Sequence, residues 1–549
     1  MSGPSVLSYA HGVSTTPLIG QTIGENLETA VVRVPERDAL VSCHQSLRLT
    51  YADFNAAVDG LATGLLRAGI ERGDRVGIWS PNCAEWSLVQ YATAKLGVIL
   101  VNVNPAYRTH ELEYVLRHSG IRMLVSSPGY KTSDYRGMAT EVAEGVETLE
   151  RVVFIGDDDW QELAAAPSDA DAIASRMAEL SFDDPINIQY TSGTTGSPKG
   201  ATLTHHNILN NGFFVAELIH ITEEDRICVP VPFYHCFGMV MGNLAATSHG
   251  ACVVIPAPTF EPEATLDAVQ AQRCTALYGV PTMFIAQLEH PRFREFDLSS
   301  LRTGIMAGSP CPVEVMKRVV SDMHMSEVSI CYGMTETSPV STQTRVDDPL
   351  ELRVGSVGRP GPHIEVKIVE PETGLTVERG DAGELCTRGY SVMLGYWEEP
   401  EKTAEAIDRA GWMHTGDLAT MDDSGYCNIV GRSKDMVIRG GENVYPREVE
   451  EFLYTHPAVA DVQVVGVPDE RYGEELCAWV VLREAVSDLD ADAVREFCNG
   501  KLAHYKVPRY LIVVDEFPMT VTGKVQKYKM REESIARLEL DAAARIATA

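Results

Sequence analysis

The stretch YTSGTTGSPKG at residues 190–200 decides how this sequence is interpreted. It follows an apolar run that includes Ile186 and Ile188, and it precedes a segment at 206–219 with a helical pattern. Residues 191–200 contain five hydroxyl side chains, three glycines and Lys199. Backbone N–H groups freed by glycine, hydroxyl donors and a lysine charge together suit a polyphosphate. The same composition is also typical of a flexible surface turn, and composition alone leaves both interpretations open.

The stretch is not a Walker A loop, which requires the pattern G-x-x-x-x-G-K-[ST]. Counting from Gly193 places Pro198 where the second glycine would stand and Gly200 where the hydroxyl residue would stand. A kinase or GTPase of that type is therefore disfavoured.

Length and composition limit the class of protein. The chain has 549 residues, more than one hydrophobic core usually organises, so we expect three or four structural units. Apolar residues make up 45% and charged residues 22%, which is ordinary for a globular protein and excludes a disordered, collagenous or disulfide-scaffold chain. The net charge of −31 repels polyanions, so we expect no nucleic acid partner.

The sequence pattern also bears on location. The first charged residue is Glu25, and the opening lacks the basic start and long apolar run of a secretory signal. No run approaches the roughly 18–20 apolar residues of a membrane span, which leaves peripheral membrane contact open. Twelve scattered cysteines show no C-x-x-C pair and no zinc-ligand spacing, which favours free thiols in a reducing cytoplasm.

The first third of the chain alternates helix and strand patterns. Thr50 is a good N-cap with Asp53 three residues on, and apolar residues then recur at helical spacing. Short strands are expected at 75–79, 97–101 and 121–126, with Thr109 capping a helix before the last of them. Similar patterning resumes after Asp184 and runs to about Gly333. Alternation at this spacing predicts parallel sheets covered by helices.

The pattern changes beyond Gly355. Turn pairs separate short alternating runs up to about Gly431, which predicts a small antiparallel or barrel-like sheet. A compact α/β unit should follow, with Pro446 as the first residue of a helix to about His456. Its further elements are expected as strands at 462–467, 478–482 and 510–514 and a helix at 491–502.

Four more short motifs occur in a fixed order after the first: YGMTE at 332–336, HTGDL at 414–418, GRSKDMVIRGGENVYP at 431–446 and a T-G-K turn ending at Lys524. Each alone is weak. Together with residues 190–200, from about Thr50 to Lys529, they resemble the adenylate-forming superfamily of acyl-CoA synthetases, peptide-synthetase adenylation domains and firefly-type luciferases. The runs TSGTTGSPKGATLTHHNILNN, PFYHCFG and GGENVYPREVE look most like medium-chain fatty acyl-CoA ligases.

This resemblance implies an α/β fold with a large N-terminal region, residues 1–433, built from two α/β subdomains and a small β-barrel-like subdomain. It implies a small mobile α/β domain at residues 434–549, which rotates about Lys434 between two half-reactions. Lys434 stands where aspartate is commoner in the family. A hinge is physically needed because Lys524 must leave the α-phosphate before a thiol can approach.

The resemblance also implies the chemistry. Such enzymes form an acyl-adenylate from a carboxylic acid and MgATP, release pyrophosphate, and transfer the acyl group to coenzyme A. The residues that would hold the β- and γ-phosphates, here called the phosphate loop, lie within 191–199 and include Thr191, Ser192, Gly193, Thr194, Thr195, Gly196 and Lys199.

The remaining nucleotide contacts are implied in the same way. Tyr332 would stack on adenine within the segment that also contains Gly333 and Met334, and Thr335 would meet the α-phosphate. Glu336 would bind Mg²⁺, an ion that prefers oxygen ligands. Asp417 would bind the ribose hydroxyls, Arg432 the ribose or phosphate, and Lys524 the oxygens around the reacting phosphorus. The residues that would border adenine and the acyl site are Gly308, Ser309 and Pro310.

Several assignments on the acyl and CoA side are less specific. His235 resembles a histidine beside the acyl pocket, although a structural role in the core suits it nearly as well. Gly440 and Gly441 would let the backbone approach the pantetheine arm. Lys501, Lys506 and Arg509 could meet CoA phosphates or simply form a solvated basic face. Candidates for an acyl tunnel, for which plain core is the commoner role, are Phe213, Phe214, Met239, Val240, Met241 and residues 278–284.

Other functions are weighed against the acyl-CoA ligase. An aryl-acid CoA ligase differs only in its pocket and stays open. An acyl-AMP ligase that loads a carrier protein is disfavoured. By the resemblance, that subgroup carries an insertion between Arg359 and Gly389, where this chain has only a short hairpin. A nucleotide-binding homologue without catalysis is disfavoured because Lys199, Glu336 and Lys524 are all present. The sequence sets neither the chain length of the acid nor an oligomeric state.

Overall fold

The computed structural model describes residues 6–191, 198–308, 311–432, 435–439, 442–469, 472–483, 486, 488–499, 501–502, 504–520 and 525–540. The chain divides into two compact units. The larger unit comprises Ala10–Val366 and Cys386–His414, and the smaller unit comprises Met1–Tyr9, Lys367–Leu385 and Thr415–Ala549. Each unit is described by itself.

A seven-stranded sheet in the larger unit has the order β19-β9-β8-β5-β4-β6-β7. Neighbours from β8 to β7 are parallel, whereas β9 and β19 pair antiparallel. Its strands are β4 (Arg75–Trp79), β5 (Ile99–Asn102), β6 (Met123–Ser126), β7 (Arg151–Phe154), β8 (Pro185–Thr191), β9 (Lys199–Thr204) and β19 (Gly395–Tyr396). The strand expected at 75–79 is confirmed to the residue, and those expected at 97–101 and 121–126 begin two residues later.

A nine-stranded sheet has the order β16-β15-β14-β13-β12-β10-β11-β2-β3. The neighbours from β14 to β2 run parallel, and the sheet ends in antiparallel strands. Its strands are β2 (Asp38–Ser42), β3 (Leu47–Thr50), β10 (Arg226–Cys228), β11 (Cys252–Ile255), β12 (Ala276–Gly279), β13 (Thr303–Ala307), β14 (Glu327–Gly333), β15 (Val340–Gln343) and β16 (Arg359–Pro360).

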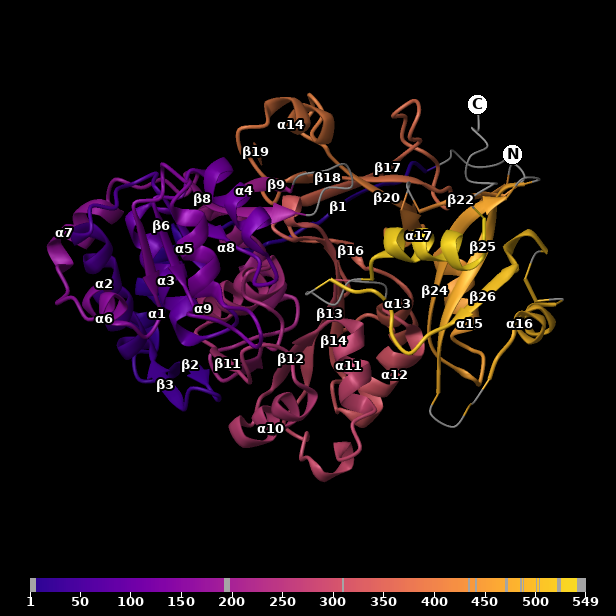
Figure 1. Cartoon of the computed structure of the whole chain (residues 1–549), viewed down its shortest axis with the longest axis horizontal. Coiled ribbons are helices and arrows are strands. Elements are labelled where there is room, and N and C mark those ends of the chain that lie inside the picture. Colours follow the sequence, from indigo (N-terminus) through magenta and orange to yellow (C-terminus); the bar gives the residue numbers. More distant parts are fainter. Residues whose placement is uncertain are drawn as a thin grey trace. The chain divides into compact units, whose positions relative to one another are not determined.

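Helices cover both sheets, and Figure 1 shows α10, α11 and α12 beside the part of the nine-stranded sheet that contains β12–β14. The first seven are α1 (Ile23–Arg33), α2 (Tyr51–Arg67), α3 (Ala84–Leu96), α4 (Thr109–Ser119), α5 (Tyr135–Ala143), α6 (Asp158–Ala164) and α7 (Ala170–Met177). The rest are α8 (His205–Glu217), α9 (Ala245–His249), α10 (Pro262–Gln272), α11 (Pro281–Leu288), α12 (Val313–Asp322), α13 (Leu350–Gly355) and α14 (Pro400–Ala406). Short helices of other types are the π-helix η1 (Phe237–Leu244) and the 3₁₀ turns η2 (Phe293–Glu295) and η3 (Thr335–Thr337).

Local sequence explains where helices start. Thr50 accepts a hydrogen bond from the backbone N–H of Asp53, and the Asp53 side chain bonds back to the Thr50 backbone, so α2 begins with the predicted capping box. The helix expected after Thr109 exists, but Arg108 occupies the N-cap position and Thr109 is the first helical residue. A cap predicted from residue type can be displaced by one residue in this way, since helix ends depend on backbone dihedrals.

One large apolar cluster joins the two sheets of the larger unit. It contains side chains from β4 and β5, from β11, and from the helices α1, α2, α3 and α8. Trp86 and Phe233 lie fully buried within it, in an edge-to-face contact with ring centroids 5.7 Å apart. The two sheets therefore share one apolar core with these helices.

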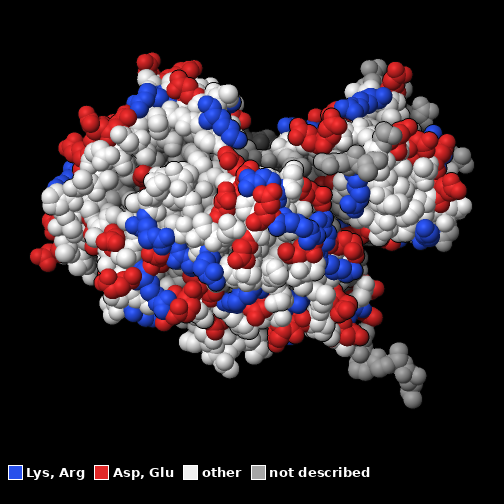
Figure 2. Space-filling model, turned by 90° about the horizontal axis from the view of Figure 1, so that it is seen from below, with Lys and Arg blue, Asp and Glu red and all other residues white. Residues whose placement is uncertain are grey.

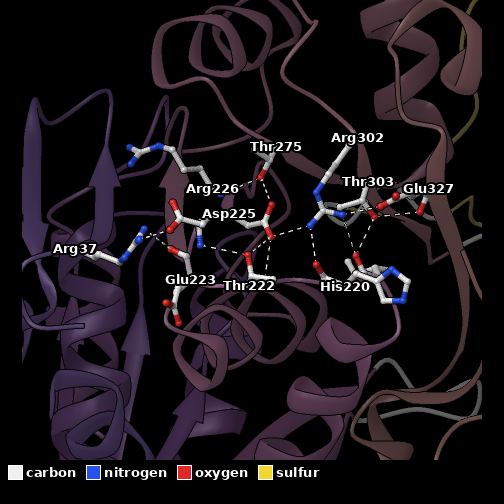
Figure 3. Close-up of polar contacts among 12 residues, drawn as sticks. Arg37, His220, Thr222, Glu223, Asp225, Arg226, Thr275, Arg302, Thr303 and Glu327 are labelled. Atoms are coloured by element: carbon white, nitrogen blue, oxygen red, sulfur yellow. Dashed lines mark hydrogen bonds and ion pairs between the residues drawn. The ribbon is translucent and has the colours of Figure 1, made fainter. Parts of the chain in front are cut away.

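The amino-terminal edge of the nine-stranded sheet is closed by the polar network in Figure 3. Arg302, just before β13, donates to Asp225 over 2.7 Å and to Glu327 over 2.6 Å. The Thr275 hydroxyl donates to the other oxygen of Asp225 over 2.6 Å. Asp225 is only 4% exposed, so its charge depends on these partners. The network leaves the opposite edge of the sheet for ligand contacts.

A five-stranded sheet with the order β1-β17-β18-β20-β21 follows the change in pattern near Gly355. Its strands are β1 (Tyr9–His11), β17 (Ile364–Val369), β18 (Gly383–Gly389), β20 (Met413–Met421) and β21 (Cys427–Arg432). The last two pair antiparallel, as the turn signals of this region predict.

The rest of the smaller unit is an α/β layer. Its sheet has the order β23-β22-β25-β24, with β26 parallel to β25. The elements are β22 (Val437–Arg439), β23 (Glu442–Val444), α15 (Pro446–Leu453), β24 (Val459–Asp469), β25 (Gly473–Leu482), α16 (Ala491–Cys498), the 3₁₀ turn η4 (His504–Lys506), β26 (Tyr510–Val513) and α17 (Lys527–Arg537). The predicted elements are all present, but α15 and α16 end earlier than expected and β24 is longer at both ends.

Alternate residues of β24 and β25 supply two separate apolar clusters. Val464 and Ala478 belong to one cluster with α15 and α16, whereas Val465 and Trp479 belong to another with α17. The period of two is that of a sheet covered on both faces. Trp479 also donates through Nε1 to the Ser534 hydroxyl of α17 over 2.8 Å, which fixes that helix on its face.

Candidate active site

The phosphate loop joins two antiparallel strands. Thr191 ends β8, Lys199 begins β9, and the two are register partners. The Thr191 hydroxyl also donates to the Lys199 carbonyl over 3.4 Å. In sheets of this kind ligands bind beyond the carboxyl ends of parallel strands, which is where β8 delivers the loop. The predicted loop residues outside the described part of the chain are Ser192, Gly193, Thr194, Thr195 and Gly196.

The YGMTE segment lies at the carboxyl end of β14 in the other sheet. Tyr332 is half-buried near the end of the strand, and Thr335 and Glu336 form the start of η3. A Cβ atom on Gly333 would lie 1.9 Å from the Pro339 carbonyl oxygen, so this position excludes any side chain. The chain can turn tightly here for that reason, and Glu336 lies in the 3₁₀ turn that follows.

Glu336 is the polar centre of the described site. It is 5% exposed, and its Oε1 accepts a hydrogen bond of 2.8 Å from the Tyr396 hydroxyl and one of 3.4 Å from the Thr191 hydroxyl. Among the described residues no lysine, arginine or histidine forms an ion pair with it. Within the described residues this buried carboxylate accepts from two hydroxyls and has no cationic partner, an arrangement that a cation would complete. The oxygen-only donors fit Mg²⁺.

Tyr396, in β19, links the acidic and basic residues of the site. Its ring lies 4.5 Å from the Lys199 ammonium, while its hydroxyl contacts Glu336. Burial raises the pKa of Tyr396, and the Glu336 charge raises it further, so the phenol stays a neutral donor. The sequence analysis missed this residue. The run GYW at 395–397 gave only a weak signal, because tyrosine in a short strand is common.

His235 precedes the π-helix η1, whose residues are all buried. Its Nδ1 accepts a hydrogen bond of 3.1 Å from the Phe237 backbone. The next residue, Cys236, donates its thiol to Gln189 of β8 over 3.0 Å. Burial raises the pKa of Cys236 to about 12, while a hydrogen bond with the Thr335 side chain opposes that rise. The His235 segment is thus tied both to the strand that carries the phosphate loop and to Thr335.

Gln189 is a second residue that the sequence analysis missed. Its Nε2 donates to the sulfur of Met239 over 3.0 Å, in addition to the contact with Cys236. Met239, Val240 and Met241 lie in the large core cluster and Phe214 is buried, consistent with the core role that is commoner for such residues. Phe213 is half-buried and stacks on His249 with centroids 4.9 Å apart.

Gly308 follows β13 at the same edge of the nine-stranded sheet as Glu336. Its φ of +92° lies in the region that favours glycine, which suits a close turn after the strand. The neighbouring Ser309 and Pro310 lie outside the described residues.

In the smaller unit, Asp417 of β20 and Arg432 of β21 are register partners. The structure therefore brings together the two residues predicted for ribose contacts. Asp417 is half-buried, and its backbone N–H donates to the Thr415 hydroxyl over 3.2 Å. The predicted residues of this unit that lie outside the described part of the chain are Lys434, Gly440, Gly441 and Lys524.

The basic residues considered for CoA phosphates already have partners in the smaller unit. Lys506 pairs with Glu448 over 2.6 Å, and Arg509 pairs with Asp469 over 2.8 Å. The Lys501 ammonium lies 4.3 Å from the Phe497 ring. These contacts agree with the alternative of a solvated basic face. On the face shown in Figure 2, lysine and arginine side chains are interspersed with aspartate and glutamate.

Family models match both parts of the chain. Residues 27–397 match the model described as AMP-binding enzyme, and residues 448–524 match the model of the AMP-binding enzyme C-terminal domain. The chain belongs to the AMP-binding enzyme family. The predicted membership of the adenylate-forming superfamily is thereby confirmed.

Curated relatives align over nearly the whole chain. The Bacillus subtilis (strain 168) protein named "Putative acyl-CoA synthetase YngI" is 50% identical over 545 residues, covering 95% of this chain and 99% of the relative. The human medium-chain acyl-CoA ligase ACSF2, mitochondrial, is 44% identical over 559 residues, covering 97% of this chain and 91% of the relative.

Solved structures of adenylate-forming enzymes share the fold. The anthranilate CoA ligase AuaEII with anthranoyl-AMP is 27% identical with a TM-score of 0.84, covering 95% of this chain and 99% of its own. The Mycobacterium tuberculosis fatty acyl CoA synthetase is 30% identical with a TM-score of 0.73, covering 94% and 99%. The predicted α/β fold class, with its barrel-like sheet, is confirmed. Within the described residues, no helix is both long enough and apolar enough to cross a membrane.

Proposed function

We propose that the chain is an ATP-dependent acyl-CoA ligase that activates a medium-chain fatty acid as its acyl-adenylate and transfers the acyl group to coenzyme A. At the level of acyl-CoA ligation through an acyl-adenylate, this prediction is confirmed by the family and by the relatives named acyl-CoA synthetase or ligase. The preference for medium chains is supported by the name of the ACSF2 relatives.

The observation that carries the site assignment is the meeting of Thr191, Tyr396 and Glu336. It joins the strand that bears the phosphate loop to the turn that bears the predicted metal ligand. Lys199 extends the site with an ammonium that forms no ion pair among the described residues, and that charge suits the terminal phosphates. A buried acidic group and an ammonium that both contact Tyr396 suit a metal–polyphosphate complex.

The reaction follows from these positions. A carboxylate oxygen of the acid attacks the α-phosphorus, the bond to the pyrophosphate oxygen breaks, and pyrophosphate leaves. The CoA thiolate then attacks the acyl carbonyl, and AMP leaves. Glu336 and Thr191 would hold Mg²⁺, which when bound offsets the charge on the phosphate oxygens. Thr335 would orient the α-phosphate, and Lys524 would stabilise the charge that builds there.

The remaining assignments belong to this proposal. His235 would border the acyl site, and Tyr332 with Gly308 would border adenine. The domain boundary between residues 433 and 434, with Lys434 as a hinge, would let the smaller domain present Lys524 in one step and the turn at Gly440 and Gly441 in the next. The cytoplasm is the proposed location, although the human relative is named mitochondrial.

Acid-dependent exchange of pyrophosphate into ATP tests the first half-reaction without coenzyme A. We expect exchange with octanoate, and its loss in Glu336→Gln. Exchange that persists in Glu336→Gln at the wild-type rate would contradict the role of Glu336. No exchange with any fatty acid would contradict the proposed reaction.

A further inference from the structure

Two side chains of α4 contact the two ends of the phosphate loop. His118 Nδ1 and the Tyr190 hydroxyl are 2.8 Å apart, and the Tyr114 hydroxyl donates to the Pro198 carbonyl over 3.0 Å. Tyr190 directly precedes Thr191, and Pro198 directly precedes Lys199. One helix therefore contacts the residue directly before the phosphate loop and a second residue near the carboxyl end of that loop.

The geometry of α4 accounts for this double contact. Tyr114 and His118 are four residues apart, so they project from the same face of the helix. Their rings stack with centroids 5.3 Å apart and an interplanar angle of 16°. Tyr190 meets both rings edge-on, at 6.3 Å from Tyr114 and 5.8 Å from His118. The three rings form one aromatic cluster at the base of the loop.

The aromatic cluster is partly shielded from water, which strengthens its hydrogen bonds. The His118 side chain is 19% exposed, and its Nε2 lies 3.9 Å from Glu399, which in turn pairs with Lys402. Burial lowers the pKa of His118 and raises that of Tyr190, so both are neutral near pH 7. A neutral imidazole can accept from Tyr190 through Nδ1 while its Nε2–H faces Glu399.

We propose that Tyr114 and His118 are positioning residues that hold Tyr190 and Pro198 in place and thereby raise the affinity for the β- and γ-phosphates of ATP. The inference rests on the proposed function, because that function assigns the loop to those phosphates. A polyphosphate site binds tightly only when the residues that flank and carry it are held in position. AMP has no β- or γ-phosphate, so its affinity should not depend on α4.

Isothermal titration calorimetry of the full-length protein with MgATP and, separately, with AMP tests this selectivity. Tyr114→Phe keeps the ring and removes only the hydroxyl, and we expect MgATP to bind about 3- to 10-fold more weakly. His118→Ala should weaken MgATP binding about 10-fold, and AMP affinity should stay within about 2-fold in both variants. His118→Asn places a polar atom near the position of Nδ1 and should recover part of the loss.

His110→Ala is the matched control, because His110 is exposed in the first turn of the same helix. It should change neither affinity. Equal weakening of MgATP and AMP binding, or unchanged MgATP binding in both Tyr114→Phe and His118→Ala, would overturn the inference. Failure of the proposed function would look different: the wild type would bind both nucleotides but show no acid-dependent pyrophosphate exchange.

Discussion

The Tyr396 hydroxyl donates a hydrogen bond of 2.8 Å to Oε1 of Glu336, across 60 residues of sequence. This contact orients a buried carboxylate at the carboxyl edge of β14. The same phenol ring lies against Lys199. Tyr396 thus contacts both the Glu336 carboxylate and the Lys199 ammonium, the two charged groups that the proposed reaction places at one end of a polyphosphate.

Removal of that hydroxyl should weaken the use of Mg²⁺. In Tyr396→Phe we expect the free Mg²⁺ concentration for half-maximal acyl-CoA formation to rise at least about 10-fold at saturating ATP. The reason is that a hydrogen bond to a charged group contributes about 1.5–3 kcal/mol. Tyr91→Phe is a suitable control, since the buried Tyr91 hydroxyl bonds to Thr247 in the core. An unchanged Mg²⁺ dependence in Tyr396→Phe would show that the contact does not position the metal ligand.

Lys524→Ala should separate binding from chemistry. The adenylation half-reaction should fall by at least about 100-fold, because a positioned positive charge stabilises the transition state, whereas MgATP affinity should change little. Single-turnover acyl-AMP formation and calorimetry measure the two quantities. Lys529→Ala, five residues further on, should leave both unchanged. Wild-type acyl-AMP formation in Lys524→Ala would exclude this lysine from the reaction.

The network at the amino-terminal edge of the nine-stranded sheet should govern stability and not activity. Arg302→Met leaves Asp225 buried without its cation, and we expect a loss of about 2–4 kcal/mol in the free energy of unfolding. Adding Asp225→Asn removes the uncompensated charge and should restore part of that loss. Urea unfolding of the wild type, Arg302→Met and the double variant measures the three free energies of unfolding. A single variant as stable as the wild type would mean that Asp225 finds other partners.

The acid sensitivity of folding should depend on His205. Burial lowers its pKa to about 3 from the ordinary 6.5, and its Nδ1 accepts a hydrogen bond from the Ile23 backbone over 3.1 Å. The folded state excludes a proton that the unfolded chain binds. The contribution of His205 to stability is therefore complete above pH 6.5 and is lost as the pH falls toward 3. At pH 5 the loss is about 2 kcal/mol.

In His205→Gln the side chain stays polar and of similar size but cannot be protonated. We expect its thermal midpoint to fall less than that of the wild type between pH 7 and pH 5. His110→Gln, at an exposed position, should follow the wild type. Parallel curves for the wild type and His205→Gln would show that His205 is not the group responsible.

Local features of the fold were readable from the sequence, and contacts between distant residues were not. The Thr50 cap, the strand Arg75–Trp79 and the start of α15 at Pro446 depend on neighbouring residues, so their patterns predicted them. Helix ends were less predictable, and α15 stops at Leu453, three residues before the expected end.

In the candidate site, too, the sequence indicated single residues but not the contacts between distant ones. Motif order indicated Thr191, Lys199 and Glu336, which the structure assembles at two strand ends. Tyr396 was missed because its role arises only from proximity to Glu336. His118 lies 72 residues from Tyr190, and no spacing rule connects two residues at that separation.

The most direct test of the central claim is AMP release from MgATP with saturated acids from acetate to palmitate, each with and without coenzyme A, and with benzoate and anthranilate as ring acids. The account predicts CoA-dependent AMP release that peaks at an intermediate chain length. AMP or acyl-adenylate formation without any effect of coenzyme A would contradict it and indicate a ligase that loads a carrier protein.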